Sequence, residues 1–212
     1  MTGSFRVLRS RRVFAGGVIA VRSDEVSMPG GHSSTRDVVE HPGAVGIVAL
    51  DDRERVALVH QYRHPVGRGL WELPAGLLDV TDEPALDAAA RELHEEAGLL
   101  ATRWDVLVDA LSSPGMTDEA FRIYLARDLR VGERPPGRDE EAELVLAWVP
   151  LREAVQRVVH GEIRNAMACI GVLATEWALG AAFAGLRPAG SPWTDRPGRS
   201  ERSEVPGPAS RP

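Results

Sequence analysis

The sequence predicts an α/β or α+β sandwich, in which a mixed sheet lies between helices and an N-terminal strand region precedes the main domain. Short segments of alternating apolar residues indicate strands through most of the first 150 residues. One helical pattern interrupts these strands early, and two further helical patterns follow them. Mixed strands that are flanked by helices in the sequence favour a sheet with helices on both faces.

The N-terminal strand region is expected over residues 1–43. Alternation predicts strands within residues 5–22 and 36–40, and the loop between them is predicted at Pro29-Gly30-Gly31. The first thirty-five residues are otherwise less distinctive than the rest of the chain.

The main domain is expected over residues 44–186. Its strands are predicted at 44–50, 55–62, 104–111, 120–127 and 143–149, and its helices at about 84–97, 150–160 and 163–184. The first helix should end at Gly98, because glycine readily adopts the left-handed conformation that closes a helix. From Arg187 onward Pro, Gly, Ser and Arg predominate, which predicts a disordered tail over residues 187–212.

Composition and charge exclude several classes of protein. With 43% hydrophobic residues among 212, the chain can bury a core, so wholesale disorder is excluded. The net charge of -6 offers no field that would attract nucleic acid, so phosphate groups must be held by local arginines or bound cations. A single cysteine, Cys169, excludes a disulfide framework and a cysteine-based zinc site within one chain, which predicts a cytoplasmic location.

No segment of the sequence indicates a membrane protein. Residues 1–12 lack the apolar core of a signal peptide. The longest apolar stretch, residues 166–186, is interrupted by Gly171, Glu176 and Gly180. We therefore expect a buried helix there rather than a membrane span.

The first helix carries the densest chemical signal. At about 100° per residue its apolar stripe is expected to face the core through Leu86, Ala90, Leu93 and Ala97. Glu92, Glu95 and Glu96 lie on a separate arc, where like charges repel unless a cation stands between them. Carboxylate ligands without His or Cys suit Mg²⁺ or Mn²⁺ rather than zinc. For three glutamates alone, a solvated acidic face would be the preferred interpretation.

The residues around these glutamates extend the signal. The segment reads G-x6-E-x7-R-E-L-H-E-E-A-G-L from Gly76 through Glu83 and Arg91 to Leu99. This resembles the Nudix box, G-x5-E-x7-R-E-U-x-E-E-x-G-U with U aliphatic, and differs from it by one extra residue between Gly76 and Glu83. The resemblance implies a Nudix-like sandwich fold and a Nudix hydrolase.

The resemblance also implies roles for individual residues. Glu92 and Glu96 look like the main ligands of Mg²⁺ (or Mn²⁺), with Glu95 as a further ligand or bridge and the carbonyl of Ala75 as a backbone ligand. Arg91 and Glu83 look like supports that orient the glutamates, so the expected catalytic residues of the box are Glu95 and Arg91. The ions would clamp a pyrophosphate and activate a water molecule.

Segments outside the box resemble ADP-ribose pyrophosphatases. The Ser112–Glu119 segment is similar to their S-P-G-x-x-x-E segment and suggests Pro114, Gly115 and Glu119 as substrate-binding residues, although Ser-Pro-Gly is also a common turn. Residues 61–63 and 71–76 resemble their Q-Y-R and E-x-P-A-G segments. That similarity suggests a phosphate-binding Arg63, a Glu72 that binds ribose or a partner arginine, and a Trp71 that stacks on a base or packs.

A last acidic segment precedes the strand at 143–149. A charge run on a loop is usually only solvated surface. Related enzymes, however, place a catalytic glutamate on a loop here, so either Glu140 or Glu141 is expected to act as the base or to position the water molecule. The segment Glu162-Ile163-Arg164-Asn165-Ala166 is likewise similar to a stretch of those pyrophosphatases. In relatives the N-terminal strands serve dimerisation, which implies a homodimer.

The sequence therefore predicts Mg²⁺-dependent hydrolysis of ADP-ribose to AMP and ribose 5-phosphate. An alternative keeps the fold but changes the substrate to another nucleoside diphosphate sugar, NADH or a dinucleoside polyphosphate. A different class of protein, a non-hydrolytic ADP-ribose sensor, would predict lost box glutamates and an added DNA-binding module. Glu92, Glu95 and Glu96 are all present, which disfavours the sensor.

Overall fold

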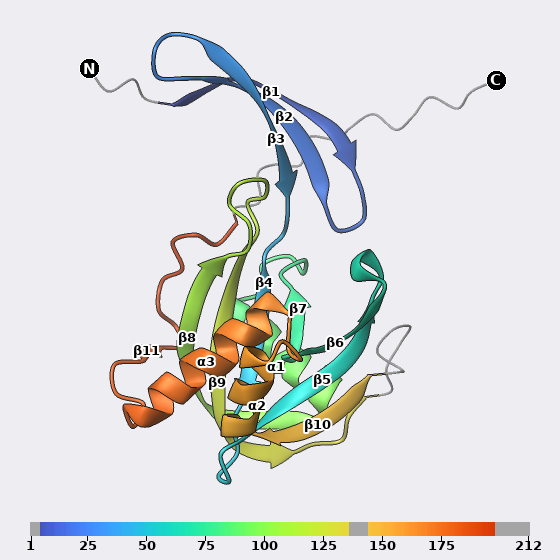
Figure 1. Ribbon diagram of the computed structural model, residues 1–212, viewed down its shortest axis with the longest axis vertical. Coiled ribbons are helices and arrows are strands. Elements are labelled where there is room, and N and C mark those ends of the chain that lie inside the picture. Colours follow the sequence, from blue (N-terminus) through green and yellow to red (C-terminus); the bar gives the residue numbers. More distant parts are fainter. Residues whose placement is uncertain (1–4, 136–143, 198–212) are drawn as a thin grey trace, which may run out of the picture. The chain divides into compact units, whose positions relative to one another are not determined.

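The computed structural model describes residues 5–135 and 144–197 (Figure 1). Contacts within the chain define two compact units. Of the described residues, 5–43, 111–120 and 196–197 belong to the first unit, and 44–110, 121–135 and 144–195 belong to the second.

The first unit is built on a three-stranded antiparallel sheet. Its strands are β1 (Arg6–Ala15), β2 (Ala20–Ser27) and β3 (Ser33–Glu40), in the order β1-β2-β3. The predicted strand region 5–22 is in fact two strands, because the chain turns at Gly16, whose backbone N–H donates to the carbonyl of Ile19 at 2.8 Å.

The second unit contains two further sheets. Their strands are β4 (Ala44–Ala49), β5 (Arg55–Arg63), β6 (Arg68–Glu72), β7 (Ala75–Leu77), β8 (Leu99–Leu111), β9 (Ala120–Val131), β10 (Val145–Pro150) and β11 (Arg187–Pro188). One sheet has the order β11-β8-β9-β4-β7, with β4 parallel to β9 and antiparallel to β7. The other is antiparallel, in the order β10-β5-β6. The short strands β6 and β7 were not predicted from the sequence.

The helices of this unit are α1 (Ala85–Ala97), α2 (Leu151–Val159) and α3 (Ala166–Gly180). Mixed sheets with helices confirm the predicted fold class. Asn165 begins α3 by accepting a hydrogen bond from the backbone of Ala168 at 2.9 Å. Helix α3 ends earlier than predicted, since Ala182 and Phe183 adopt positive φ angles that no helix can continue through.

Strand β4 lies at the centre of the core and is buried on both faces. Val45 and Ile47 pack in one apolar cluster with Leu93 of α1. Val48, which points the opposite way, packs in a second cluster with Val172 of α3. Helix α1 and helix α3 therefore cover opposite faces of the sheet, and this explains why every residue of β4 is buried (Figure 1).

The predicted disordered tail is wrong for its first residues. Arg187 and Pro188 form β11, which pairs with β8. The buried guanidinium of Arg122 donates to the carbonyls of Ser191 at 2.8 Å and Pro192 at 3.0 Å. Composition missed this ordering because it depends on contacts with residues far away in the sequence: Arg122 binds two backbone carbonyls, and Ala189 and Trp193 pack against a core cluster. Residues 198–212 lie outside the described part of the chain.

Arg122 is anchored from both sides. Its guanidinium donates to both carboxylate oxygens of Asp109, at 2.7 and 2.9 Å, and lies 5.0 Å from the ring centroid of Trp193. Arg187 donates to the same carboxylate at 2.8 Å. Among the described residues, no helix is long and apolar enough to cross a membrane.

Truncation after Leu186 is expected to destabilise the protein. It removes β11 and leaves the buried Arg122 without two of its acceptors, a loss that costs about 1–3 kcal/mol for a buried polar group. The melting temperature should fall by roughly 5 °C or more. A chain that ends at Pro197 keeps every one of these contacts and serves as the control. Equal melting temperatures for the two truncations would contradict the structural role of the segment.

Candidate active site

Helix α1 carries its glutamates on a face that is partly buried. The predicted apolar stripe is wrong in one respect, because Ala90 is exposed and the buried face is rotated toward Glu92 and Glu96. Those two side chains belong to residues that are only 8% and 5% exposed. Buried carboxylates are costly unless they have partners. The glutamates are therefore not a solvated acidic face.

An open cavity of about 430 Å³ lies beside this face. The described residues that line it come from β5, β7, the loop after β7, and α1: Gln61, Arg63, Ala75, Gly76, Leu77, Asp79, Val80, Arg91, Glu92, Glu95 and Glu96. The structure thus brings together all four predicted metal ligands, along with Arg63 and Arg91. Their functional roles stay predictions.

Arg91 is the central cation of this cluster. Its guanidinium pairs with both oxygens of Glu83, each at 3.0 Å. Its Nη1 atom donates to Glu92 at 2.7 Å and to Glu95 at 3.0 Å. The hydrogen bonds with Glu83 raise the pKa of Arg91 above its ordinary value. One arginine therefore offsets the repulsion among three carboxylates.

Strand β7 binds the third glutamate, Glu96, and approaches α1 closely. The backbone N–H of Ala75 donates to Glu96 at 3.0 Å. A Cβ atom on Gly76 would lie 2.1 Å from the carboxylate of Glu92, so no larger residue fits while that side chain keeps its place. The glycine at the start of the motif is thus required by the close packing of β7 on the acidic face.

The donor chemistry of the cavity fits a hard divalent cation, since its ligands would be oxygens alone. Among the described residues, no three His, Cys, Asp or Glu side chains converge closely enough to hold an ion as they stand. The reason lies in their partners, because Glu92 and Glu95 face Arg91 and Glu96 faces the backbone of Ala75. A cation at Glu92 and Glu95 would have to compete with Arg91.

A buried carboxylate fixes Arg63 at the cavity wall. Glu72 is 2% exposed and accepts three hydrogen bonds from Arg63, the shortest at 2.7 Å. The side-chain amide of Gln61 also donates to Glu72, at 3.3 Å. Glu72 is not among the described residues that line the cavity. Of the two roles considered for it, the geometry favours the partner of an arginine over contact with ribose.

Trp71 lies on the opposite face of β6 from Glu72, because neighbouring residues of a strand point to opposite sides. Its ring packs against the core cluster around Leu58 and lies 5.0 Å from the ring of His60. It is not one of the described cavity-lining residues. Of its two predicted uses, packing is the one that this geometry favours.

The structure adds residues to the site that the sequence analysis did not select. Gln61 lies two positions before Arg63 on β5 and therefore shares its face, a signal that alternation could have supplied. Asp79, in the loop after β7, adds a fourth carboxylate to the cavity. An isolated acidic residue in a loop carries no sequence signal of this kind.

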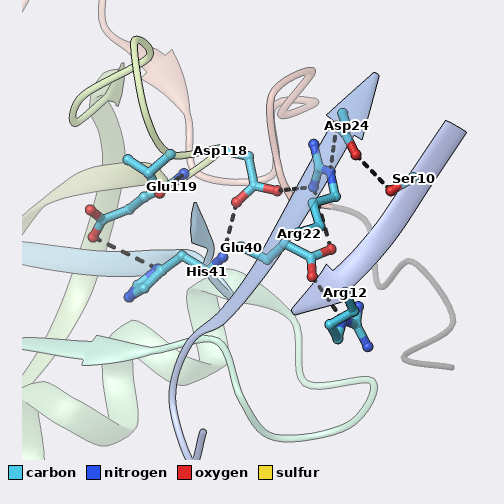
Figure 2. A network of polar contacts seen from close by, with 9 residues as sticks. Ser10, Arg12, Arg22, Asp24, Glu40, His41, Asp118 and Glu119 are labelled. Carbon is cyan, nitrogen blue, oxygen red and sulfur yellow. Dashed lines mark hydrogen bonds and ion pairs between the residues drawn. The ribbon is translucent and has the colours of Figure 1, made fainter. Parts of the chain in front are cut away.

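The Ser112–Glu119 segment belongs to the first unit. Figure 2 shows how Asp118 anchors it: the carboxylate accepts hydrogen bonds from the backbone N–H of His41 at 2.9 Å and from Arg22 at 3.4 Å. Arg22 also pairs with Asp24 at 2.9 Å. The segment is therefore tied to the three-stranded sheet by charged side chains.

The roles of five further residues of the predicted site also stay predictions. Pro114 and Gly115 form a turn of the first unit, and Glu119 accepts a hydrogen bond from Ser112 at 2.6 Å. Neither observation tests contact with substrate. Glu140 and Glu141 lie outside the described residues.

The pairing of Arg91 with Glu83 should make stability depend on pH. The hydrogen bonds from Arg91 lower the pKa of Glu83 below its ordinary value. The stabilisation is therefore fully present above the unfolded pKa of about 4.3 and is lost as the pH falls through the folded pKa. We expect Glu83→Gln to lower the melting temperature at neutral pH, and we expect this deficit to shrink progressively as the pH falls below about 4.

Thermal unfolding between about pH 3 and pH 7 measures this deficit. Glu133→Gln is the control, since Glu133 is an exposed glutamate of the same unit. It should melt like the wild type throughout the range. A deficit of constant size for Glu83→Gln would contradict the pairing.

Comparisons with known proteins agree with this geometry. The family model described as NUDIX domain matches residues 40–168. The chain is 51% identical to the ADP-ribose pyrophosphatase of Mycobacterium tuberculosis, over 91% of this chain and 93% of that protein. It is 33% identical to the methanol dehydrogenase activator of Bacillus methanolicus, over 79% of this chain and 90% of that one.

A solved structure shows a similar fold. The crystal structure titled ADP compounds hydrolase superposes with a TM-score of 0.73 over 86% of this chain and 98% of its own, at 20% identity. At that identity the likeness concerns the fold alone. The match to the family model and the 51% identity to a relative establish that the chain belongs to the Nudix family and is a Nudix hydrolase.

Proposed function

We propose that the chain hydrolyses the pyrophosphate bond of ADP-ribose to AMP and ribose 5-phosphate. The observation that carries this proposal is the shared cavity, which Glu92, Glu95 and Glu96 line together with Arg63. The relative of 51% identity that is named ADP-ribose pyrophosphatase supports the same substrate. The match over 91% of this chain makes that support extend beyond the Nudix box.

The charge of the cavity argues for a bound cation. The described residues of its lining include four carboxylates and two guanidinium groups. A diphosphate would be repelled by this excess of negative charge unless divalent cations reduced it. Nudix ADP-ribose pyrophosphatases are in general dependent on divalent metal ions. We propose Mg²⁺ as the physiological ion, with Mn²⁺ as the alternative.

We propose that one set of cavity residues binds the cation and that Arg63 binds the substrate. Glu92, Glu95, Glu96 and the carbonyl of Ala75 would hold the metal, which neutralises phosphate charge and activates water. Arg63, held at the cavity wall by Glu72, presents a guanidinium to a phosphate oxygen. The predicted base, Glu140 or Glu141, is part of the proposal without structural support.

Two alternatives remain distinct from this proposal. Another nucleoside diphosphate sugar, NADH or a dinucleoside polyphosphate would use the same acidic helix and the same Arg63. A non-hydrolytic sensor would have no need for three box carboxylates around one cavity. The convergence of Glu92, Glu95 and Glu96 on that cavity therefore favours hydrolysis over sensing.

Product analysis across a substrate panel tests the function. With Mg²⁺, ADP-ribose should give AMP and ribose 5-phosphate faster than nucleoside diphosphate sugars, NADH or dinucleoside polyphosphates. In H₂¹⁸O the label identifies the phosphorus that is attacked. Glu96→Gln should reduce turnover by roughly 10²-fold or more while the protein stays folded. The amide oxygen of the glutamine can still accept the hydrogen bond from Ala75.

Each outcome separates one alternative from the proposal. A much lower rate with ADP-ribose than with the other compounds would contradict the substrate. Turnover of Glu96→Gln near the wild-type value would contradict the metal-binding role of the box. Absence of hydrolysis with every compound, in a chain that binds ADP-ribose, would favour the sensor.

We further propose that the first unit joins two copies of this chain in a homodimer. Strand β1 lies at one edge of its sheet, and no described strand pairs with its outer side. Apolar side chains of this strand and of the residues next to it are exposed: Phe5, Val7, Leu8, Val13, Phe14, Val18 and Ile19. An exposed apolar edge strand invites pairing with another chain.

Light scattering after size-exclusion chromatography tests the dimer. The wild type should have the mass of two chains, and a variant with both Leu8→Glu and Phe14→Glu should have the mass of one. Val131→Glu is the matched control, because Val131 is 88% exposed but belongs to the second unit. A monomeric wild type at micromolar concentration would contradict the proposal.

A further inference from the structure

The segment that follows β9 crosses the C-terminal end of α1. The backbone N–H of Gly132 donates to the carbonyl of Gly98 at 2.8 Å. Two residues later, Nε of Arg134 donates to the carbonyl of Glu95 at 3.1 Å. A Cβ atom on Gly98 would lie 3.0 Å from the Cβ atom of Arg134, so the two residues are already in close contact. A residue outside the Nudix box therefore binds its last turn.

The end of a helix needs such partners. The last four backbone carbonyls of a helix receive no hydrogen bond from within the helix, and the C-terminal end carries a partial negative charge. In α1 the backbone N–H of Gly98 serves the carbonyls of His94 and Leu93. The carbonyl of Glu95 is instead served by the positively charged Arg134. Arg134 thus satisfies a backbone group and also stabilises the helix dipole.

The last turn of α1 also carries part of the active site. The carboxylates of Glu95 and Glu96 line the cavity, and both residues lie within three positions of Gly98. From the other side, the backbone N–H of Ala75 on β7 binds Glu96. If the turn frayed, both carboxylates would lose their fixed position. Arg134 is not among the described residues that line the cavity, and its contact with the carbonyl of Glu95 connects it to this turn.

We propose that Arg134 is a positioning residue, which fixes the last turn of α1 so that Glu95 and Glu96 are placed for binding a divalent cation. This inference rests on the proposed metal site. It assigns a role to a side chain 39 residues away from the carbonyl that it binds. The alternative is a purely structural cap, whose loss would lower stability and leave cation affinity unchanged.

The variant Arg134→Met separates the two roles. Methionine keeps the Cβ atom beside Gly98 and an unbranched aliphatic side chain, and it removes the donor and the charge. We expect Mn²⁺, measured by electron paramagnetic resonance, to bind about tenfold more weakly, which is the usual effect of losing a group that orients metal ligands. The kcat for ADP-ribose should fall by a similar factor, with less change in KM. Arg134→Lys, which retains a charged donor, should restore most of the affinity.

Arg130→Ala is the matched control, because Arg130 is an exposed arginine on β9. It should bind Mn²⁺ like the wild type. Wild-type Mn²⁺ affinity in Arg134→Met, with or without a lower melting temperature, would overturn the inference. A wild-type chain that binds no Mn²⁺ would overturn the metal site as well. If Arg134→Met binds Mn²⁺ more weakly but the wild type is inactive on ADP-ribose, the positioning role is supported and only the proposed substrate is contradicted.

Discussion

Repulsion among carboxylates on one short helical arc is the constraint on which this site depends. Glu92 and Glu96 are buried, so neither can be screened by bulk water. The structure answers with Arg91, whose guanidinium reaches Glu92 and Glu95, and with the backbone N–H of Ala75, which binds Glu96. The site therefore has an internal cation of its own. A divalent ion bound at Glu92 and Glu95 would have to compete with that arginine for the two carboxylates.

The packing of α1 on the sheet explains why Glu92 and Glu96 are buried. Strand β4 is covered on both faces, by α1 on one side and α3 on the other, so α1 is held firmly against the sheet through Leu93. Strand β7 pairs with β4, forms the edge of the same sheet and brings Gly76 against the carboxylate of Glu92. Helix α1 and strand β7, with Gly76 at their contact, together form one side of the cavity. Arg134 closes the far end of the helix.

Side chains alternate between the two faces of β6, so neighbouring residues that the sequence suggested for one binding site point in opposite directions. Glu72 and Trp71 are neighbours in the sequence, yet Glu72 points to Arg63 while Trp71 packs into the core. The cavity thus receives the guanidinium of Arg63 rather than either of these side chains. In the same way Arg122 turns a Pro-rich segment into ordered structure, because it binds the carbonyls of Ser191 and Pro192.

The sequence by itself determined the fold class and the acidic helix with its end at Gly98, and its motif carried the resemblance to the Nudix family, because periodicity and motif spacing are local properties of the chain. It could not place Ala90 outside the core, since which side of a helix is covered depends on the elements that pack on it. It also could not find β7, Asp79 in the cavity, the ordered residues after Leu186, or the contact of Arg134 with Glu95. Each of these depends on groups far apart in the sequence, and only the tertiary structure decides which of them meet.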